Sequence, residues 1–104
     1  MHPLISEPVD ALKGTVVIPG DKSISHRAVL LGALAAGKTK IQGLLEGDDV
    51  KRTICAIRDL GCRAESLGSG RWAIQGRGIG GLSPSTRVLE MGNSGTAARL
   101  LLGV

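Results

Sequence analysis

The sequence predicts an α/β fold in which helices pack on a mixed β-sheet. Strand-like segments, which alternate in polarity or are rich in β-branched residues, are interleaved with segments whose apolar residues recur at helical spacing. Two further strand-like segments follow each other directly and are separated by Gly68-Ser69-Gly70, which is a hairpin signal. The expected order is therefore β-α-β-α-β-β, followed by one more strand and the beginning of another helix.

The first part of the chain supplies one helix between two strands. Residues 15–18 are rich in β-branched side chains and are closed by Pro19-Gly20, which predicts a strand. Residues 39–43 alternate in polarity and predict the next strand. Between them we expect a helix that ends at Ala36, with Gly37 as its C-terminal stop. Its apolar stripe consists of Ile24, Ala28, Leu31 and Ala35, and Leu30 and Leu34 widen it.

The acidic turn at residues 46–49 begins the second predicted helix. Asp48 is the expected N-cap, and its charge and that of Asp49 favour the positive end of a helix. We expect this helix to end at Gly61. Its apolar face consists of Val50, Ile54, Ile57 and Leu60.

The predicted hairpin pairs residues 63–67 with residues 71–75. Trp72 and Ile74 share one side of the second strand, so we expect both in the core.

A glycine-rich connection over residues 76–81 follows the hairpin and leads to a strand predicted over residues 86–90. The final helix is expected to begin near Ser94. The connection is not followed directly by a helix, so it lacks the context of a dinucleotide-binding fingerprint. The spacing of a Walker A phosphate-binding loop is also absent.

Composition favours a small soluble globular domain. The chain has 104 residues, of which 42% are hydrophobic and 21% are charged, as is typical of folded proteins. No apolar run approaches the ~20 residues that span a bilayer, and residues 1–10 lack the apolar core of a secretion signal. We therefore expect a cytoplasmic protein that binds no membrane. The net charge is +4, but the basic residues are dispersed and Trp72 is the only aromatic residue, which argues against nucleic-acid binding.

The cysteines and histidines do not form a metal-binding pattern. Cys55 and Cys62 are seven residues apart, and neither CxxC nor HxxxH spacing occurs. We expect reduced, buried thiols and no metal. For His26, one interpretation is that it titrates beside a ligand. The favoured alternative is that it is an exposed or internally hydrogen-bonded helix residue.

Two segments combine a strand end, a turn and a helix start with groups that bind anions. In the first segment, residues 19–27, Lys22 supplies a point charge and Arg27 a guanidinium fork suited to carboxylate or phosphate. The free backbone N–H groups of the helix start also favour an anion. Two hydroxyl groups are added by Ser23 and Ser25. The alternatives are that Asp21 or Ser23 merely caps the helix and that the cations are solvated surface charges.

The second segment covers residues 90–99. Gly92 and Gly95 would allow a ligand to approach the backbone closely. Arg99 adds a positive charge. Hydrogen-bonding side chains are added by Asn93, Ser94 and Thr96. The alternatives are that Asn93 caps the helix and that Arg99 is a solvated charge.

Four motifs in the chain are similar to a known family. They are GDKSISHRA at residues 20–28, LAAGKT at 34–39, GLLEGDDV at 43–50 and GNSGTAAR at 92–99. Together they resemble the N-terminal part of the 5-enolpyruvylshikimate-3-phosphate synthase (3-phosphoshikimate 1-carboxyvinyltransferase) family. The resemblance implies the enolpyruvyl transferase fold, with two domains of three βαβαββ units each. Residues 1–19 would then be a strand segment that packs with the other domain, and residues 20–104 the first unit and the start of the next.

The resemblance also implies a reaction. The family transfers the enolpyruvyl group of phosphoenolpyruvate to the 5-hydroxyl of shikimate 3-phosphate and releases phosphate, a step of chorismate and aromatic amino-acid synthesis that uses no metal or organic cofactor. Lys22 matches the lysine that contacts phosphoenolpyruvate and the inhibitor glyphosate. Ser23 and Arg27 match residues that hold shikimate 3-phosphate. The loop beside phosphoenolpyruvate is matched by Asn93, Gly95 and Thr96, with Arg99 in the same motif.

The family's catalytic Asp and Glu lie later in its chain, so no catalytic residue is expected here. We therefore expect a fragment that needs the remainder of the enzyme or a complementing fragment as its partner. A helix that is still apolar at Val104 also favours a fragment. One alternative is an inactive anion-binding fragment. Another is a relative of UDP-N-acetylglucosamine enolpyruvyl transferase, which typically has Asn where this chain has Ser23.

Overall fold

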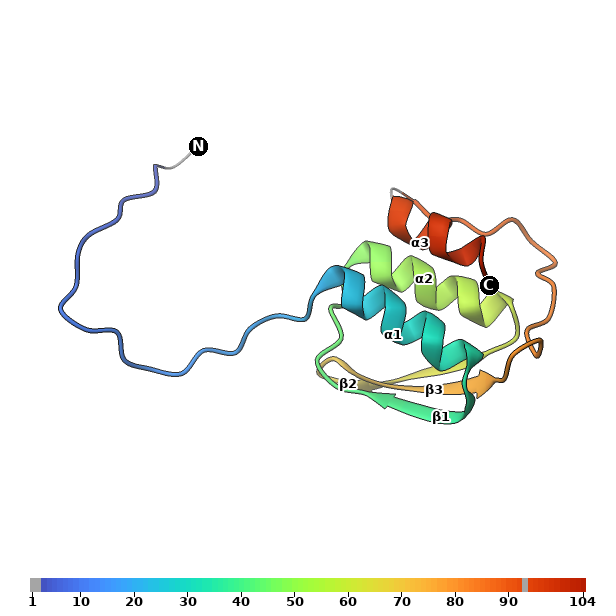
Figure 1. Ribbon diagram of the computed structural model, residues 1–104. Helices are drawn as coiled ribbons and strands as arrows, with labels where there is room; N and C mark the ends of the chain where they lie inside the picture. The colour runs from blue at the N-terminus through green and yellow to red at the C-terminus, as the bar shows by residue number, and fades with distance from the viewer. Residues whose placement is uncertain (1–2, 93) are drawn as a thin grey trace.

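The computed structural model describes residues 3–92 and 94–104. The elements run in the order α1 (Lys22–Leu34), β1 (Ala36–Ile41), α2 (Asp48–Asp59), β2 (Arg63–Gly68), β3 (Arg71–Arg77) and α3 (Gly95–Leu101). Helices α1 and α2 lie side by side over one face of the sheet, and α3 packs on both of them (Figure 1). The α/β class is confirmed.

The sheet has three strands in the order β1-β3-β2, and both pairings are antiparallel. The hairpin prediction is confirmed, because Ala64 of β2 lies opposite Ile74 of β3. The prediction of a mixed sheet is wrong for the described residues. Strands β1 and β2 do run in the same direction, as a helical crossover favours, but β3 lies between them and pairs with both.

Helix α1 begins at its side-chain cap and ends earlier than predicted. The Asp21 carboxylate accepts a hydrogen bond from the Ile24 amide at 2.9 Å. The helix ends at Leu34, and Gly37 therefore lies inside β1 rather than stopping the helix. The reason is that Ala35 is already extended and its N–H bonds to the Leu31 carbonyl, so the residue with a positive φ, Gly37 at 103°, falls within the strand and not at the helix end.

Helix α2 has a different N-cap from the predicted one. Gly47 occupies the cap position without a side-chain bond, and Asp48 and Asp49 lie in the first turn, near the positive end of the helix. The end at Gly61 is confirmed, since Gly61 has a φ of 100° and its N–H bonds to the Arg58 carbonyl.

The core lies between the two long helices and the sheet. Trp72 and Ile74 are both buried, as predicted, and the indole Nε1 of Trp72 donates to a Glu46 carboxylate oxygen at 2.9 Å. The largest aliphatic side chains that are fully buried come from α1, α2 and β3; they are Val29, Val50, Ile54, Ile57 and Ile74. Because no Phe or Tyr is present, aliphatic residues fill most of this core.

Two predicted strands do not form. Residues 15–18 are exposed and pair with no strand in the described part of the chain; Figure 1 shows them in an extended segment that leads away from the folded body. Residues 86–90 are not a strand either. There, the Ser85 hydroxyl bonds both the N–H and the carbonyl of Arg87, and this local bend interrupts the extended pattern.

The cysteines differ in their surroundings. Cys62 is buried, whereas Cys55 is exposed on the outward side of α2, so the expectation of two buried thiols is wrong for Cys55. Both are free thiols. Among the residues that the structure describes, no helix combines the length and the apolar character needed to cross a membrane.

Candidate functional site

The two segments that sequence analysis singled out meet at one end of the helical layer. Figure 1 shows α1, α2 and α3 all beginning at this end. Lys22, the first residue of α1, forms an ion pair with Asp49 in the first turn of α2 (Nζ to Oδ2, 2.5 Å). His26 of α1 lies within 3.5 Å of Ser94, the N-cap of α3. Residues 68 positions apart in sequence therefore belong to one local structure.

The side chains of the first segment remain accessible to a ligand. The Lys22 side chain is 50% exposed despite its ion pair. Ser23 and Arg27 are also exposed, and Arg27 Nη1 donates to the Ser23 carbonyl at 3.1 Å. Because Asp21 caps the helix, the alternative that Ser23 caps it is wrong.

Ser25 departs from its predicted role as a ligand-facing hydroxyl. It is buried, and its Oγ accepts the N–H of Leu45 at 3.0 Å. This bond ties α1 to the loop before α2. Ser25 therefore has a structural role, because it fixes the first segment against the loop before α2.

The second segment is divided between surface and interior. Gly95 and Arg99 are exposed on α3, and Thr96 is half-buried. A Cβ placed on Gly95 would lie 3.2 Å from Arg99 Nη1, so the Arg99 guanidinium lies over this glycine. Asn93 lies outside the described residues. Ser94 is buried, and its Oγ accepts the N–H of Ala97 at 3.2 Å, so Ser94 caps α3. The prediction that its hydroxyl is available to a ligand is therefore wrong.

Two charged residues at this end were not predicted as members of the site. From the sequence, Asp49 was expected only as a charge at a helix start, and Arg52 was not expected at the site. A Cβ placed on Gly92 would lie 3.2 Å from Arg52 Nε, so Arg52 lies beside the loop that precedes α3. The signal in the sequence is their spacing, because residues three apart on a helix share one face. Helix α2 therefore supplies charged side chains to both segments.

His26 is buried and electrically neutral at physiological pH. Its imidazole has no exposed surface, and Nδ1 lies 2.7 Å from Thr53 Oγ1. Burial lowers the pKa of His26 from 6.5, the positive charges of Lys22 and Arg27 lower it further, and Asp49 opposes them. The structure thus favours the internally hydrogen-bonded interpretation of His26.

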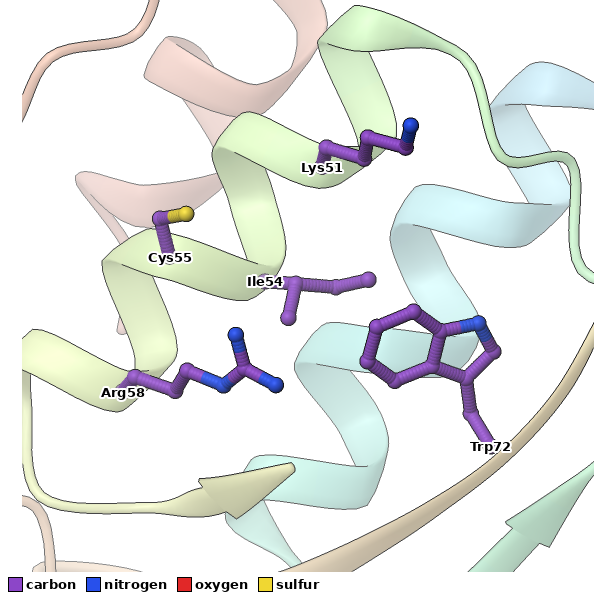
Figure 2. Close-up of a pocket in the computed structure, with 5 residues that line it drawn as sticks. All are labelled: Lys51, Ile54, Cys55, Arg58 and Trp72. Atoms are coloured by element: carbon purple, nitrogen blue, oxygen red, sulfur yellow. The ribbon is translucent and has the colours of Figure 1, made fainter. Parts of the chain in front are cut away.

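A separate pocket lies between α2 and β3 and contains none of the predicted site residues. It has a volume of about 190 Å³ and is lined by Lys51, Ile54, Cys55, Arg58 and Trp72. Figure 2 shows Ile54 and Arg58 of α2 facing the Trp72 ring. The Arg58 guanidinium carbon lies 5.7 Å from the ring centroid, and its Nε and Nη2 donate to the Ala64 carbonyl. These contacts stabilise the packing of α2 on the hairpin.

No cluster of three or more potential metal ligands occurs among residues 3–92 and 94–104. The exposed cations at the meeting point of the three helices suit anionic groups, and they lie among the carboxylates of Asp21, Asp48 and Asp49. The cations include Lys22, Arg27 and Arg99, with Arg52 beside them.

Comparison with known proteins identifies the family. Residues 6–104 match the family model described as EPSP synthase (3-phosphoshikimate 1-carboxyvinyltransferase). The chain belongs to the EPSP synthase family. A 3-phosphoshikimate 1-carboxyvinyltransferase from Acidiphilium cryptum (strain JF-5) is 58% identical over 97 residues, which are 93% of this chain and 22% of that protein. The protein of the same name from Granulibacter bethesdensis is 62% identical over 89 residues, 86% of this chain and 20% of its own length.

A solved structure supports the same assignment. The EPSP synthase from Acinetobacter baumannii matches with a TM-score of 0.83 and 47% identity, over 89% of this chain and 21% of that one. The chain therefore spans about a fifth of the length of these EPSP synthase relatives. The family and the fold class expected from the sequence motifs are confirmed.

Proposed function

We propose that this chain forms the N-terminal portion of an EPSP synthase, which transfers the enolpyruvyl group of phosphoenolpyruvate to the 5-hydroxyl of shikimate 3-phosphate and releases phosphate. The observation that carries the proposal is the meeting of the two motif segments at one end of the helices, within a chain of this family. Both substrates are polyanions, and the exposed cations at this end suit them.

In this proposal, the first segment binds both substrates. Lys22 contacts phosphoenolpyruvate, and Ser23 and Arg27 hold shikimate 3-phosphate. The half-exposed pair with Asp49 does not prevent this, because exposed ion pairs contribute only about 0–1 kcal/mol and exchange partners readily. A phosphate or carboxylate can therefore bind the Lys22 ammonium at little cost.

The second segment forms the side of the phosphoenolpyruvate site in the proposal. Gly95 lets a ligand approach the backbone of α3, and Thr96, Asn93 and Arg99 contribute polar groups and charge. Glyphosate, an anion that resembles phosphoenolpyruvate in charge, would bind the same place through Lys22. The proton transfers of the addition and elimination steps are assigned to parts of the enzyme outside this chain.

The extended N-terminal segment fits the proposed domain arrangement. Residues 1–19 would join a strand to the other domain, and residues 20–104 would form the first βαβαββ unit and the start of the next. Several apolar side chains along the segment are fully or largely exposed; they are Leu4, Ile5, Leu12, Val16 and Val17. The remainder of the enzyme, or a complementing fragment, would bury them.

A hybrid enzyme tests the proposal. This chain replaces the matching 97-residue segment of the Acidiphilium cryptum protein. Phosphate release is then measured with both substrates. We expect activity, and we expect Lys22→Ala to lower kcat/KM for phosphoenolpyruvate by at least tenfold, because a charged hydrogen bond contributes about 1.5–3 kcal/mol.

The matched control is Lys38→Ala, which removes an exposed lysine from β1. It should leave kcat/KM unchanged. An inactive hybrid, or equal effects of the two alanine substitutions, would contradict the proposed function.

A further inference from the structure

A buried polar cluster joins the three helices behind the proposed substrate site. It consists of His26 from α1, Thr53 from α2 and Ser94, the N-cap of α3, with exposed fractions of 0%, 0% and 2%. None of the three side chains is assigned a substrate contact in the proposed function. Buried polar groups cost free energy unless each finds a partner, so the arrangement requires an explanation.

One arrangement of protons satisfies all of the contacts. The Thr53 hydroxyl donates to the Asp49 carbonyl at 3.4 Å, so its oxygen is free to accept the Nδ1–H of His26 at 2.7 Å. Ser94 Oγ accepts the Ala97 N–H, so its proton can point to His26 Nε2 at 3.5 Å. The other neutral tautomer would require the Thr53 hydroxyl to donate to His26, and the bond to Asp49 would be lost.

The cluster helps to determine the position of α3, because this helix is short. A helix of seven residues has little stability of its own, so tertiary contacts determine where it begins. Ser94 directly precedes Gly95 and Thr96 in the second segment, and His26 lies one helical turn after Lys22 in the first. The His26 ring therefore lies between the backbones that carry the two segments.

We propose that His26 is a positioning residue: as a neutral imidazole bonded to Thr53 and Ser94, it holds the first turn of α3 against α1 and α2 and so sets the spacing of the two substrate-binding segments. The consequence for substrate binding rests on the proposed function. The structural claim, that His26 restrains α3, does not.

The kinetic test uses the active hybrid enzyme described above. His26→Leu introduces an apolar side chain of similar volume and removes both hydrogen bonds. We expect the KM for phosphoenolpyruvate to rise about tenfold, because the loop before α3 lies beside that substrate. The KM for shikimate 3-phosphate should change less than twofold, since its contacts are on α1. A substitution that only unfolded part of the enzyme would lower the apparent kcat and leave both KM values unchanged.

A conservative variant supplies the rescue. The amide oxygen of Gln reaches about as far as Nε2 of His and can accept the Ser94 hydroxyl proton, so His26→Gln can still bond Ser94. It should return the KM for phosphoenolpyruvate to within threefold of the unsubstituted hybrid. Equal KM values for phosphoenolpyruvate in the His26→Leu variant and the unsubstituted hybrid would overturn the inference while leaving the proposed function intact.

Hydrogen exchange tests the structural claim without any need for activity. In the same hybrid, His26→Leu should speed amide exchange in α3 by tenfold or more and leave the β2–β3 hairpin unchanged. Unchanged exchange in α3 would overturn the inference even if the hybrid were inactive, whereas the loss of activity alone would count only against the proposed function.

Discussion

Lys22 and Arg99 occupy different positions relative to solvent and to their neighbours, although each is a cation in a proposed substrate-binding segment. Lys22 has an acidic partner on another helix, Asp49, with which it shares a half-exposed ion pair. Arg99 lies over Gly95 of its own helix, where the glycine leaves room for its guanidinium. A side chain at position 95 would therefore act first on Arg99.

Gly95→Ala should make the hybrid enzyme less sensitive to glyphosate. The added Cβ would lie 3.2 Å from Arg99 Nη1, so the guanidinium must shift, and the methyl group would narrow the space beside the proposed phosphoenolpyruvate site. Glyphosate is longer than phosphoenolpyruvate, so we expect its inhibition constant to rise more than the KM for phosphoenolpyruvate. Inhibition assays of both proteins measure this difference. Equal inhibition would show that Gly95 does not line the site.

Gly76 illustrates how one backbone position determines the packing of an element. A Cβ placed on it would collide with the Ala35 carbonyl oxygen and also meet the Gly32 carbonyl, so the absence of a side chain lets β3 lie directly under the end of α1. Because both contacts are with backbone atoms, no side-chain rotation can relieve them.

Gly76→Ala should therefore destabilise the fold by about 1–3 kcal/mol, the usual cost of overpacking. The control is Gly47→Ala, where the added Cβ would meet nothing within 4 Å. Gly47 is the N-cap of α2, and its replacement should cost less than about 1 kcal/mol. Urea denaturation of the 104-residue chain compares the two. Similar losses of unfolding free energy would contradict the proposed close packing at Gly76.

The junction of the three helices should make stability depend on pH through His26. The pKa of His26 is lowered in the folded chain by burial and by Lys22 and Arg27 on α1; Asp49 on α2 opposes this, and α3 presents the uncharged Ser94. Between the folded pKa and about 6.5 the unfolded chain binds more protons. The free energy of unfolding should therefore fall as the pH drops below about 6.5.

Urea midpoints measured between pH 7.5 and pH 5 would reveal this dependence. His26→Gln cannot titrate, so the variant should lose that part of the slope. The same slope in both proteins would show that His26 does not carry it.

The elements with a strong local signal were predictable from the sequence, and those that depend on distant partners were not. The hairpin at Gly68-Ser69-Gly70 and the helix start at Ser94 follow from local turn and cap chemistry, and both are confirmed. The order of the strands was not accessible, because nothing local indicates that β3 lies between β1 and β2. The β-branched residues at 15–18 predict an extended backbone, but they do not indicate whether a partner strand is present.

The candidate site shows the same division. The motif residues on α1 and α3 were found from their residue types and spacing, and the structure brings their segments together. The side chains that connect them are buried polar residues on helix faces, His26 and Thr53. His26 lies outside the apolar stripe predicted for α1, whose members Ile24 and Leu31 are exposed. No local pattern marks it, because its pairing with Thr53 spans 27 positions.

The whole chain is more extended than a compact domain of its length. Its radius of gyration is 17.2 Å, whereas about 13 Å is usual for 100 residues. Residues 3–19 account for the difference, since they run away from the folded body (Figure 1). Their exposed apolar side chains, such as Leu12 and Val17, match a segment that is buried elsewhere in the proposed full enzyme.

Trypsin should therefore cut the isolated chain rapidly after Lys13, which is exposed in this segment. In the hybrid enzyme the same bond should be cut at least tenfold more slowly, because the proposed domain contact would cover it. Mass spectrometry of the first fragments measures both rates. Equal cleavage would contradict the proposed packing of residues 1–19 with the other domain.

The isolated 104-residue chain should bind anions but show no enolpyruvyl transfer. Its described exposed groups at the helix junction are cations, hydroxyls and the carboxylates of Asp21 and Asp48, and its buried imidazole is bonded to Thr53 and Ser94. None of these is assigned the proton transfers of the reaction, and general acid–base catalysis typically contributes about 10²- to 10⁴-fold to a rate. Incubation with both substrates should therefore release no phosphate above background, while the hybrid enzyme does. Turnover by the isolated chain would show that it carries a complete acid–base set, and that the assignment of these steps to other parts of the enzyme is wrong.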